Sequence, residues 1–133
     1  MKRTLVRENV FKILFRYDFH DQTEFENQVE AYFTDEENLL ISELDKAEIT
    51  SRVNDCVSHM ADIDEKISGN CKGWTIERIG KAELAILRLA VYEIVYDEEL
   101  DKAVAINEAV ELSKKFCDEK SHSFVNGVLA RIA

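Results

Sequence analysis

Residues 85–96 of the chain read AILRLAVYEIVY, and this stretch decides the fold class. It is apolar almost all the way round, which in a soluble protein is typical of a helix buried among other helices. Arg88 and Glu93 interrupt the apolar run, and Glu83 stands just before it. Charges close to a core are costly unless they are paired or meet a partner, so these three residues are candidates for a role beyond packing.

The composition around this stretch predicts an all-α protein. The chain has 133 residues with no Pro and four Gly, and helix formers dominate. This length fits one domain, or two small lobes that share a core. Cys56, Cys71 and Cys117 are far apart and lack metal-ligand spacing, so we expect reduced thiols and no metal site. No apolar run reaches the roughly 18 residues that cross a bilayer, which indicates a soluble cytoplasmic protein without membrane contact.

The charge is unevenly distributed along the chain. The net charge of −10 argues against a nucleic-acid partner, because binding a polyanion usually needs a cationic surface. Residues 1–20, however, carry five basic side chains against two acidic ones, whereas residues 21–49 carry ten acids and Lys46 alone. The acidic segment is typical of a solvated surface, and it could also repel nucleic acid from the wrong face.

The first helix is expected over residues 5–19, where five apolar residues follow one buried stripe. Phe11, Phe15 and Phe19 fall on the opposite side, next to Lys12. Either a second layer of helices covers these rings, or they form an exposed platform on which unpaired bases stack. Taken alone, three phenylalanines favour burial. The stripe consists of Val6, Val10, Ile13, Leu14 and Tyr17.

Periodicity and capping signals predict the remaining helices. We expect an inward-facing helix over 24–33, packing of Leu39 to Leu44, and one long amphipathic helix from residue 45 or 46 to 68, closed by a left-handed cap at Gly69 and Asn70. A short helix capped by Thr75 follows, with Trp74 covering the junction of two lobes, about 1–70 and 71–133. Three more helices are expected: one over 81–96, one that Asp101 caps, and a last one that Ser121 caps.

Gly127 interrupts the pattern of the last expected helix. A mid-helix Gly costs about 1 kcal/mol relative to Ala. Close approach of a neighbouring helix is the expected compensation.

Three ordered motifs in the second half carry a family resemblance. The segments GW…RIGKAELAILRLAVYEIVY, VAINEAVELSKKF and SHSFVNGVL closely resemble the NusB family of bacterial transcription antitermination factors. The specific part runs from Gly73 to Leu129, and Arg7-Glu8 followed by Leu14-Phe15 is similar to the family's first helix.

The resemblance implies a single domain of about seven helices in two small lobes, without catalytic activity, cofactor or metal. Family members bind the boxA element of nascent ribosomal RNA transcripts and pair with the ribosomal protein NusE. The pair joins NusA, NusG and RNA polymerase, and a homodimer is also possible. On this reading Phe15 becomes part of an exposed RNA surface.

Residue roles follow from the matching positions. Glu83 matches the position that faces NusE; its alternative is a salt bridge to Arg78 or Lys81. Arg88 is expected to pair with Glu93 or Glu108. Phe124 could instead be core, Ser121 only a cap, and His122 an incidental exposed residue. The RNA-binding positions are Lys2, Arg3, Arg7, Lys12, Phe15, Lys120, Ser121, His122 and Phe124.

The sequence departs from the family pattern at two places. Three residues separate Arg3 from Arg7 where relatives have denser arginines, which predicts weaker RNA affinity. Asp101 stands where relatives usually have Pro.

A fused RNA methyltransferase would need a glycine-rich cofactor loop, which these residues lack. A helical protein-interaction module with little or no RNA binding of its own is the alternative.

Overall fold

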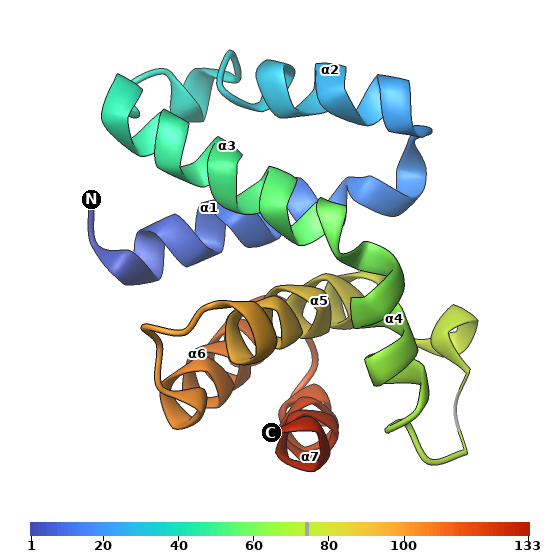
Figure 1. Ribbon diagram of the computed structural model, residues 1–133. Coiled ribbons are helices and arrows are strands. Elements are labelled where there is room, and N and C mark those ends of the chain that lie inside the picture. The colour runs from blue at the N-terminus through green and yellow to red at the C-terminus, as the bar shows by residue number, and fades with distance from the viewer. Residues whose placement is uncertain (74) are drawn as a thin grey trace. The chain divides into compact units, whose positions relative to one another are not determined.

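The computed structural model describes residues 1–73 and 75–133 (Figure 1). Across these residues the chain forms seven α-helices and three 3-10 helices, with no strand. The all-α prediction is confirmed. Trp74, the expected cover of the lobe junction, lies outside the described residues.

The helices divide between two compact units, Met1–Val57 and Ser58–Ala133. By this division α4 (Met60–Ser68) belongs to the second unit, whereas the lobe boundary expected from sequence lies after it, near residue 70. Gly69 and Asn70, next to the expected boundary, end α4 and do not separate the units.

The first unit contains α1 (Arg3–Phe15), α2 (Gln22–Tyr32) and α3 (Glu43–Ser58), whose last residue already belongs to the second unit. The 3-10 helices η1 (Tyr17–Phe19) and η2 (Glu36–Asn38) lie in the connections. The predicted inward faces are confirmed except at Tyr17, which lies in η1 and is only partly buried. Their buried apolar side chains are Val6, Val10, Ile13, Leu14, Phe25, Val29, Tyr32, Phe33, Ile49, Val53 and Cys56.

The first helix ends four residues earlier than predicted. Its last turn tightens, because the N–H of Arg16 donates to the carbonyl of Ile13 (3.0 Å) and the chain continues into η1. The Arg16 side chain is drawn toward α2 and beyond, where it binds Asp35 at 3.0 Å and lies over the Tyr32 ring at 5.2 Å. These contacts fit the tight turn better than a continued helix.

The segment from Leu39 to Leu44 does not pack as expected. Leu39, Leu40 and Leu44 are 61%, 99% and 84% exposed. The neighbouring Asn38 is buried instead, and its side-chain amide donates to the carbonyl of Tyr32 at 2.9 Å. Anchoring by Asn38 satisfies this part of the backbone while the leucine side chains stay in water, so apolar content alone was a poor guide to burial here.

The predicted long helix over 45–68 is interrupted at His59. Its backbone (φ −108°, ψ 12°) leaves the helical region and separates α3 from α4. The His59 ring stacks on Tyr96 with centroids 3.8 Å apart. Packing of this ring within the second unit accounts for a break that the periodicity, which continues through Met60, Ile63 and Ile67, does not reveal.

The second unit is assembled around α5 (Lys81–Tyr96), as the opening stretch predicts. Every residue from Leu84 to Ile94 is buried. The helix contacts α4, α6 (Lys102–Phe116) and α7 (Ser121–Ile132); in Figure 1, α4 lies at one end of α5, and α6 and α7 lie below it. The short η3 (Ile76–Arg78) precedes it.

The buried charge on α5 has a partner that the sequence analysis did not name. Arg88 is 6% exposed, and its Nε and Nη2 donate to the two oxygens of Asp64 on α4 at 2.8 and 2.9 Å. The expected partners were Glu93 and Glu108. A two-pronged bond of this kind fixes both distance and orientation, so it joins α4 to α5 in one register.

Replacing Asp64 by Ala is expected to lower the free energy of unfolding by about 3 kcal/mol, because the buried guanidinium of Arg88 loses both hydrogen bonds to this carboxylate. Urea denaturation followed by circular dichroism measures the change. Glu65→Ala, on the exposed side of the same helix, serves as the control and should cost less than about 0.5 kcal/mol. Equal losses in the two variants would contradict a buried ion pair.

The predicted caps are confirmed in part. Asp101 caps α6, its Oδ1 accepting from the N–H of Ala103 at 2.8 Å. Thr75 precedes η3 but makes no side-chain cap. The left-handed cap at Gly69 is wrong, since its φ is −71° and the described glycine with positive φ is Gly73 (75°). Asn70 closes α4 instead, its amide donating to the carbonyl of Lys66 at 2.8 Å.

Gly127 is not explained by a close helix approach. A methyl group added there would come within 4 Å of one atom outside its own helix backbone and its immediate neighbours, the Nη1 of Arg131 at 3.5 Å, which is an ordinary contact. The backbone of α7 is helical at this position. The glycine therefore costs stability without a packing return.

Gly127→Ala is expected to raise the free energy of unfolding by about 0.5–1 kcal/mol, because alanine loses less backbone entropy in a helix. Thermal melting measures the gain as a higher Tm. A lower Tm would show that the added methyl group is not tolerated at this position.

Candidate nucleic-acid and partner interface

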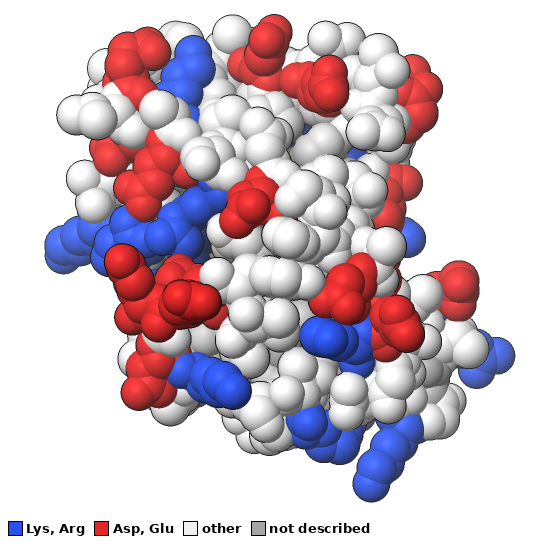
Figure 2. Space-filling view, viewed as in Figure 1, with Lys and Arg blue, Asp and Glu red and all other residues white. Residues whose placement is uncertain are grey.

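Most basic side chains of the first unit come from α1 and the residues flanking it, and Figure 2 shows Lys and Arg gathered near the N-terminus. Arg3 forms an ion pair with Glu48 of α3, and this guanidinium, followed in effect by Arg52, lowers the pKa of the Glu48 carboxyl. Lys12 lies 3.9 Å from Glu8, one helical turn away, and keeps 41% of its side chain exposed. Exposed Lys2 precedes the helix.

Arg7 differs from the other predicted RNA-binding cations because it is buried, with 9% of its surface exposed. A guanidinium in this position has its phosphate-binding atoms largely withdrawn from water. The structure therefore gives Arg7 a place in the packing of α1, and the predicted contact with RNA has less support than those of Lys2 and Lys12.

Of the three phenylalanines Phe11, Phe15 and Phe19, one is buried and two are exposed, so each of the two alternatives holds for part of the set. Phe11 is core, at 4% exposed, whereas Phe15 and Phe19 are 38% and 56% exposed. The two exposed rings lie 5.4 Å apart and tilted by 54°. Phe19 was not among the predicted site residues, although its spacing of four from Phe15 was the signal that pairs the rings. Exposed neighbouring rings suit stacking of unpaired bases.

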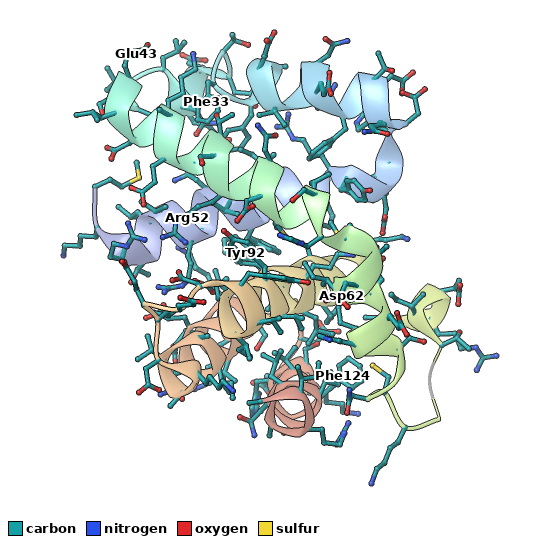
Figure 3. The ribbon with its side chains drawn as sticks, in the orientation of Figure 1. Phe33, Glu43, Arg52, Asp62, Tyr92 and Phe124 are labelled. Atoms are coloured by element: carbon teal, nitrogen blue, oxygen red, sulfur yellow. The ribbon has the colours of Figure 1, made fainter. Side chains whose placement is uncertain are left out.

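A pocket of about 290 Å³ lies in the second unit, where the first turn of α7 meets the start of α5. Phe124, labelled in Figure 3, projects from α7 and lines it. Four of the predicted site residues share this pocket. Its lining comprises Arg78, Ile79, Gly80, Glu83, Asp118, Lys120, Ser121 and Phe124.

Ser121 does not cap α7 as predicted. Lys120 holds the N-cap position, without a side-chain cap bond, and the Ser121 hydroxyl donates to Oε1 of Glu83 at 2.8 Å. The partner of Glu83 is thus neither of the two cations considered from sequence. The bond joins the residue predicted to face NusE to a residue predicted to face RNA.

The carboxylate of Glu83 also interacts with the thiol of Cys117, which follows the last residue of α6. Burial raises the pKa of this thiol to about 12, and the negative charge of Glu83 together with its hydrogen bond adds to the rise. The thiol is therefore protonated at neutral pH and acts as a second donor to Glu83.

His122 and Phe124 lie between the alternatives considered from sequence. Both are partly buried. The Nδ1 of His122 is enclosed and has no hydrogen-bond partner, so this histidine is not the freely exposed side chain expected. Phe124 belongs neither to the sealed core nor to the open surface, since its ring lines the pocket.

The predicted site residues therefore form two groups, one on α1 of the first unit and one at the start of α7 in the second. No group of three or more potential metal ligands occurs within the described residues. None of the described helices is both long and apolar enough to cross a membrane.

We expect alkylation of Cys117 by iodoacetamide to rise about tenfold per pH unit between pH 8 and 10, because burial raises the pKa of its thiol to about 12, whereas the rate for an ordinary thiol, with a pKa of about 8.5, levels off above about pH 9.5. Peptide mass spectrometry separates Cys117 from the buried Cys56 and Cys71. In Glu83→Gln the curve should level off at lower pH. A plateau by about pH 10 in the parent protein would contradict the raised pKa.

Comparisons with known proteins agree over nearly the whole chain. A model of the NusB family matches residues 4–133. The transcription antitermination protein NusB of Agathobacter rectalis is 44% identical, with all of both chains covered, and that of Oceanobacillus iheyensis is 40% identical, covering 99% of this chain and 98% of the relative.

Solved structures give the same result. NusB of T. maritima superposes with a TM-score of 0.87 at 31% identity, covering 100% of this chain and 91% of that one. A chain from a complex of NusB and NusE with double-stranded RNA gives 0.79 at 30% identity, covering 98% and 94%.

Proposed function

Because the chain belongs to the NusB family of transcription antitermination proteins, we propose that it binds the boxA element of nascent ribosomal RNA transcripts together with the ribosomal protein NusE. The protein is an antitermination factor and not an enzyme. The similar structure of NusB and NusE with double-stranded RNA supports both proposed partners.

The exposed ring pair of Phe15 and Phe19 is the observation that carries the RNA proposal. Phe15 ends α1 and Phe19 ends η1, and exposed neighbouring rings of this kind add little to a folded core, whereas bases stack readily on them. Lys12 lies about one turn before Phe15 and can hold a phosphate. Phe15 is thus the central RNA contact of the first unit.

The pocket at α7 supplies the second proposed RNA surface. Lys120 provides a cation, Phe124 an aromatic face, and Ser121 a polar group for base edges. The partly buried His122, next to Ser121 in the chain, is a further proposed contact outside the pocket lining. Glu83, in the same pocket, is the proposed contact for NusE, because a carboxylate complements a basic ribosomal protein.

The wider assembly follows from the family. We propose that the protein acts in the cytoplasm and that the complex with NusE joins NusA, NusG and RNA polymerase on the transcript. A homodimer of the free protein is an additional possibility that sedimentation equilibrium resolves directly.

One observation favours the alternative, a protein-interaction module with little RNA binding of its own. Arg3 is paired with Glu48, and Arg7 is buried, so the N-terminal arm offers few open cations. In that case NusE binding would be retained while the RNA surface contributes nothing.

Fluorescence anisotropy of a labelled boxA RNA distinguishes the two functions. The protein is titrated alone and then saturated with NusE, at 50 and 200 mM salt, because phosphate contacts weaken with salt. The proposed function predicts saturable binding that Phe15→Ala and Phe19→Ala weaken. Absence of binding in both conditions, with NusE still bound, selects the interaction module.

Lys120→Glu is expected to weaken boxA binding about tenfold at low salt, because it places a carboxylate where a phosphate is proposed. The variant should melt at the parent temperature, since Lys120 is exposed. Lys114→Glu is the matched control: it makes the same charge change at an exposed position of α6 outside the pocket lining. Equal affinities of parent and Lys120→Glu would reject this contact.

A further inference from the structure

We propose that the carboxylate of Glu83 couples the two binding events: in the free protein it holds the Ser121 hydroxyl and opposes RNA, and a basic partner that takes over the carboxylate releases that hydrogen bond. This inference rests on the proposed function and adds to it a regulatory contact within the second unit. The observation behind it is the 2.8 Å bond that joins the two predicted faces.

The position of the carboxylate depends on Gly80. Glu83 is the third residue of α5, and Gly80 is its N-cap. A Cβ at residue 80 would overlap Oε2 of Glu83 and lie 3.1 Å from its Cδ. The carboxylate therefore lies in the space that the missing side chain leaves, above the start of α5, where the helix dipole also favours a negative charge.

Two donors from other elements hold the carboxylate in this space. Ser121 donates from the first turn of α7. The Cys117 thiol donates from the end of α6. Glu83 is thus a positioning residue for the start of α7, and its charge stays inside the pocket even though its side chain is only half-buried.

The pocket that contains this charge also contains the proposed RNA residues. Lys120 and Phe124 line it together with Glu83. A phosphate that approaches Lys120 meets a fixed carboxylate nearby, and the Ser121 hydroxyl is already engaged. Both effects act against RNA in the free protein.

A basic partner reverses both effects in the same direction. Its cation neutralises Glu83 and competes with Ser121 for the carboxylate oxygens, so the hydroxyl becomes available and the repulsion falls. Because coupling between two ligands is reciprocal, RNA must strengthen partner binding by the same factor. Couplings of this kind amount to about tenfold in affinity.

The test compares boxA affinity, by anisotropy, for the parent, Glu83→Gln and Gly80→Ala, each alone and with saturating NusE. Glu83→Gln removes the charge and keeps a hydrogen-bond acceptor. Gly80→Ala keeps Glu83 but moves its carboxylate, and alanine readily adopts the φ of −58° and ψ of 146° found there. Both variants, without NusE, should bind RNA about tenfold tighter than the parent without NusE.

Two controls separate the coupling from general charge effects. Glu77→Gln removes an exposed charge from η3, outside the pocket lining, and should leave RNA affinity unchanged. Gly80→Ala should also lower the pKa of Cys117, read from its alkylation curve, because the carboxylate has moved away. A purely structural role of Gly80 would not change that curve.

The outcomes distinguish this inference from the proposed function. If the parent binds RNA while both variants bind it no tighter, or if Glu77→Gln tightens binding as much, the coupling is refuted and the proposed function stands. If the parent binds no RNA with or without NusE, the proposed function fails and the coupling fails with it.

Discussion

The second unit depends on one constraint, which is that α5 is buried on all sides from Leu84 to Ile94. A helix without a solvent-facing side needs many neighbours, and α4, α6 and α7 are its neighbours within the second unit. Apolar packing alone leaves the register of such neighbours loosely defined. The bidentate bond between Arg88 and Asp64 sets the register of α4, because its geometry tolerates little sliding. A buried ion pair adds little net stability, so its contribution here is chiefly to specify one arrangement.

The same helix organises the candidate site at its N-terminal end. There α5 emerges from the core, and Gly80 leaves room for Glu83 to bend back over the helix start. The ends of α6 and α7 meet at that carboxylate through Cys117 and Ser121. Because α5 is fixed by its neighbours, the pocket at its start is held by a rigid element, as a binding site requires. The packing that buries α5 therefore also fixes the position of the pocket at its N-terminal end.

Periodicity predicted which faces of the helices are buried. It did not predict the helix break or the exposed leucines, which depend on individual side-chain contacts. The inward faces of α1, α2 and α5 were predictable because burial follows the helical repeat. The break at His59 depends on a ring stacked against Tyr96, thirty-seven positions later in the numbering, and no local pattern encodes it. Leu39, Leu40 and Leu44 are apolar yet exposed, since the buried amide of Asn38 anchors that segment. The site residues came from the family resemblance, whereas the Ser121–Glu83 bond required the structure because each residue had a plausible local partner.

The acidic composition and a polyanionic ligand are compatible because the cations of α1 are held by weak pairs. Arg3 with Glu48 and Lys12 with Glu8 are partly exposed ion pairs, each worth at most about 1 kcal/mol. A phosphate can replace the carboxylate at such a cation at little cost. The phosphate still releases its own condensed counterion, but the displaced carboxylate loses its ion pair, so each contact gains less free energy than an unpaired lysine would provide. A larger share of the affinity must therefore come from base stacking on the exposed Phe15 and Phe19, which does not depend on net charge.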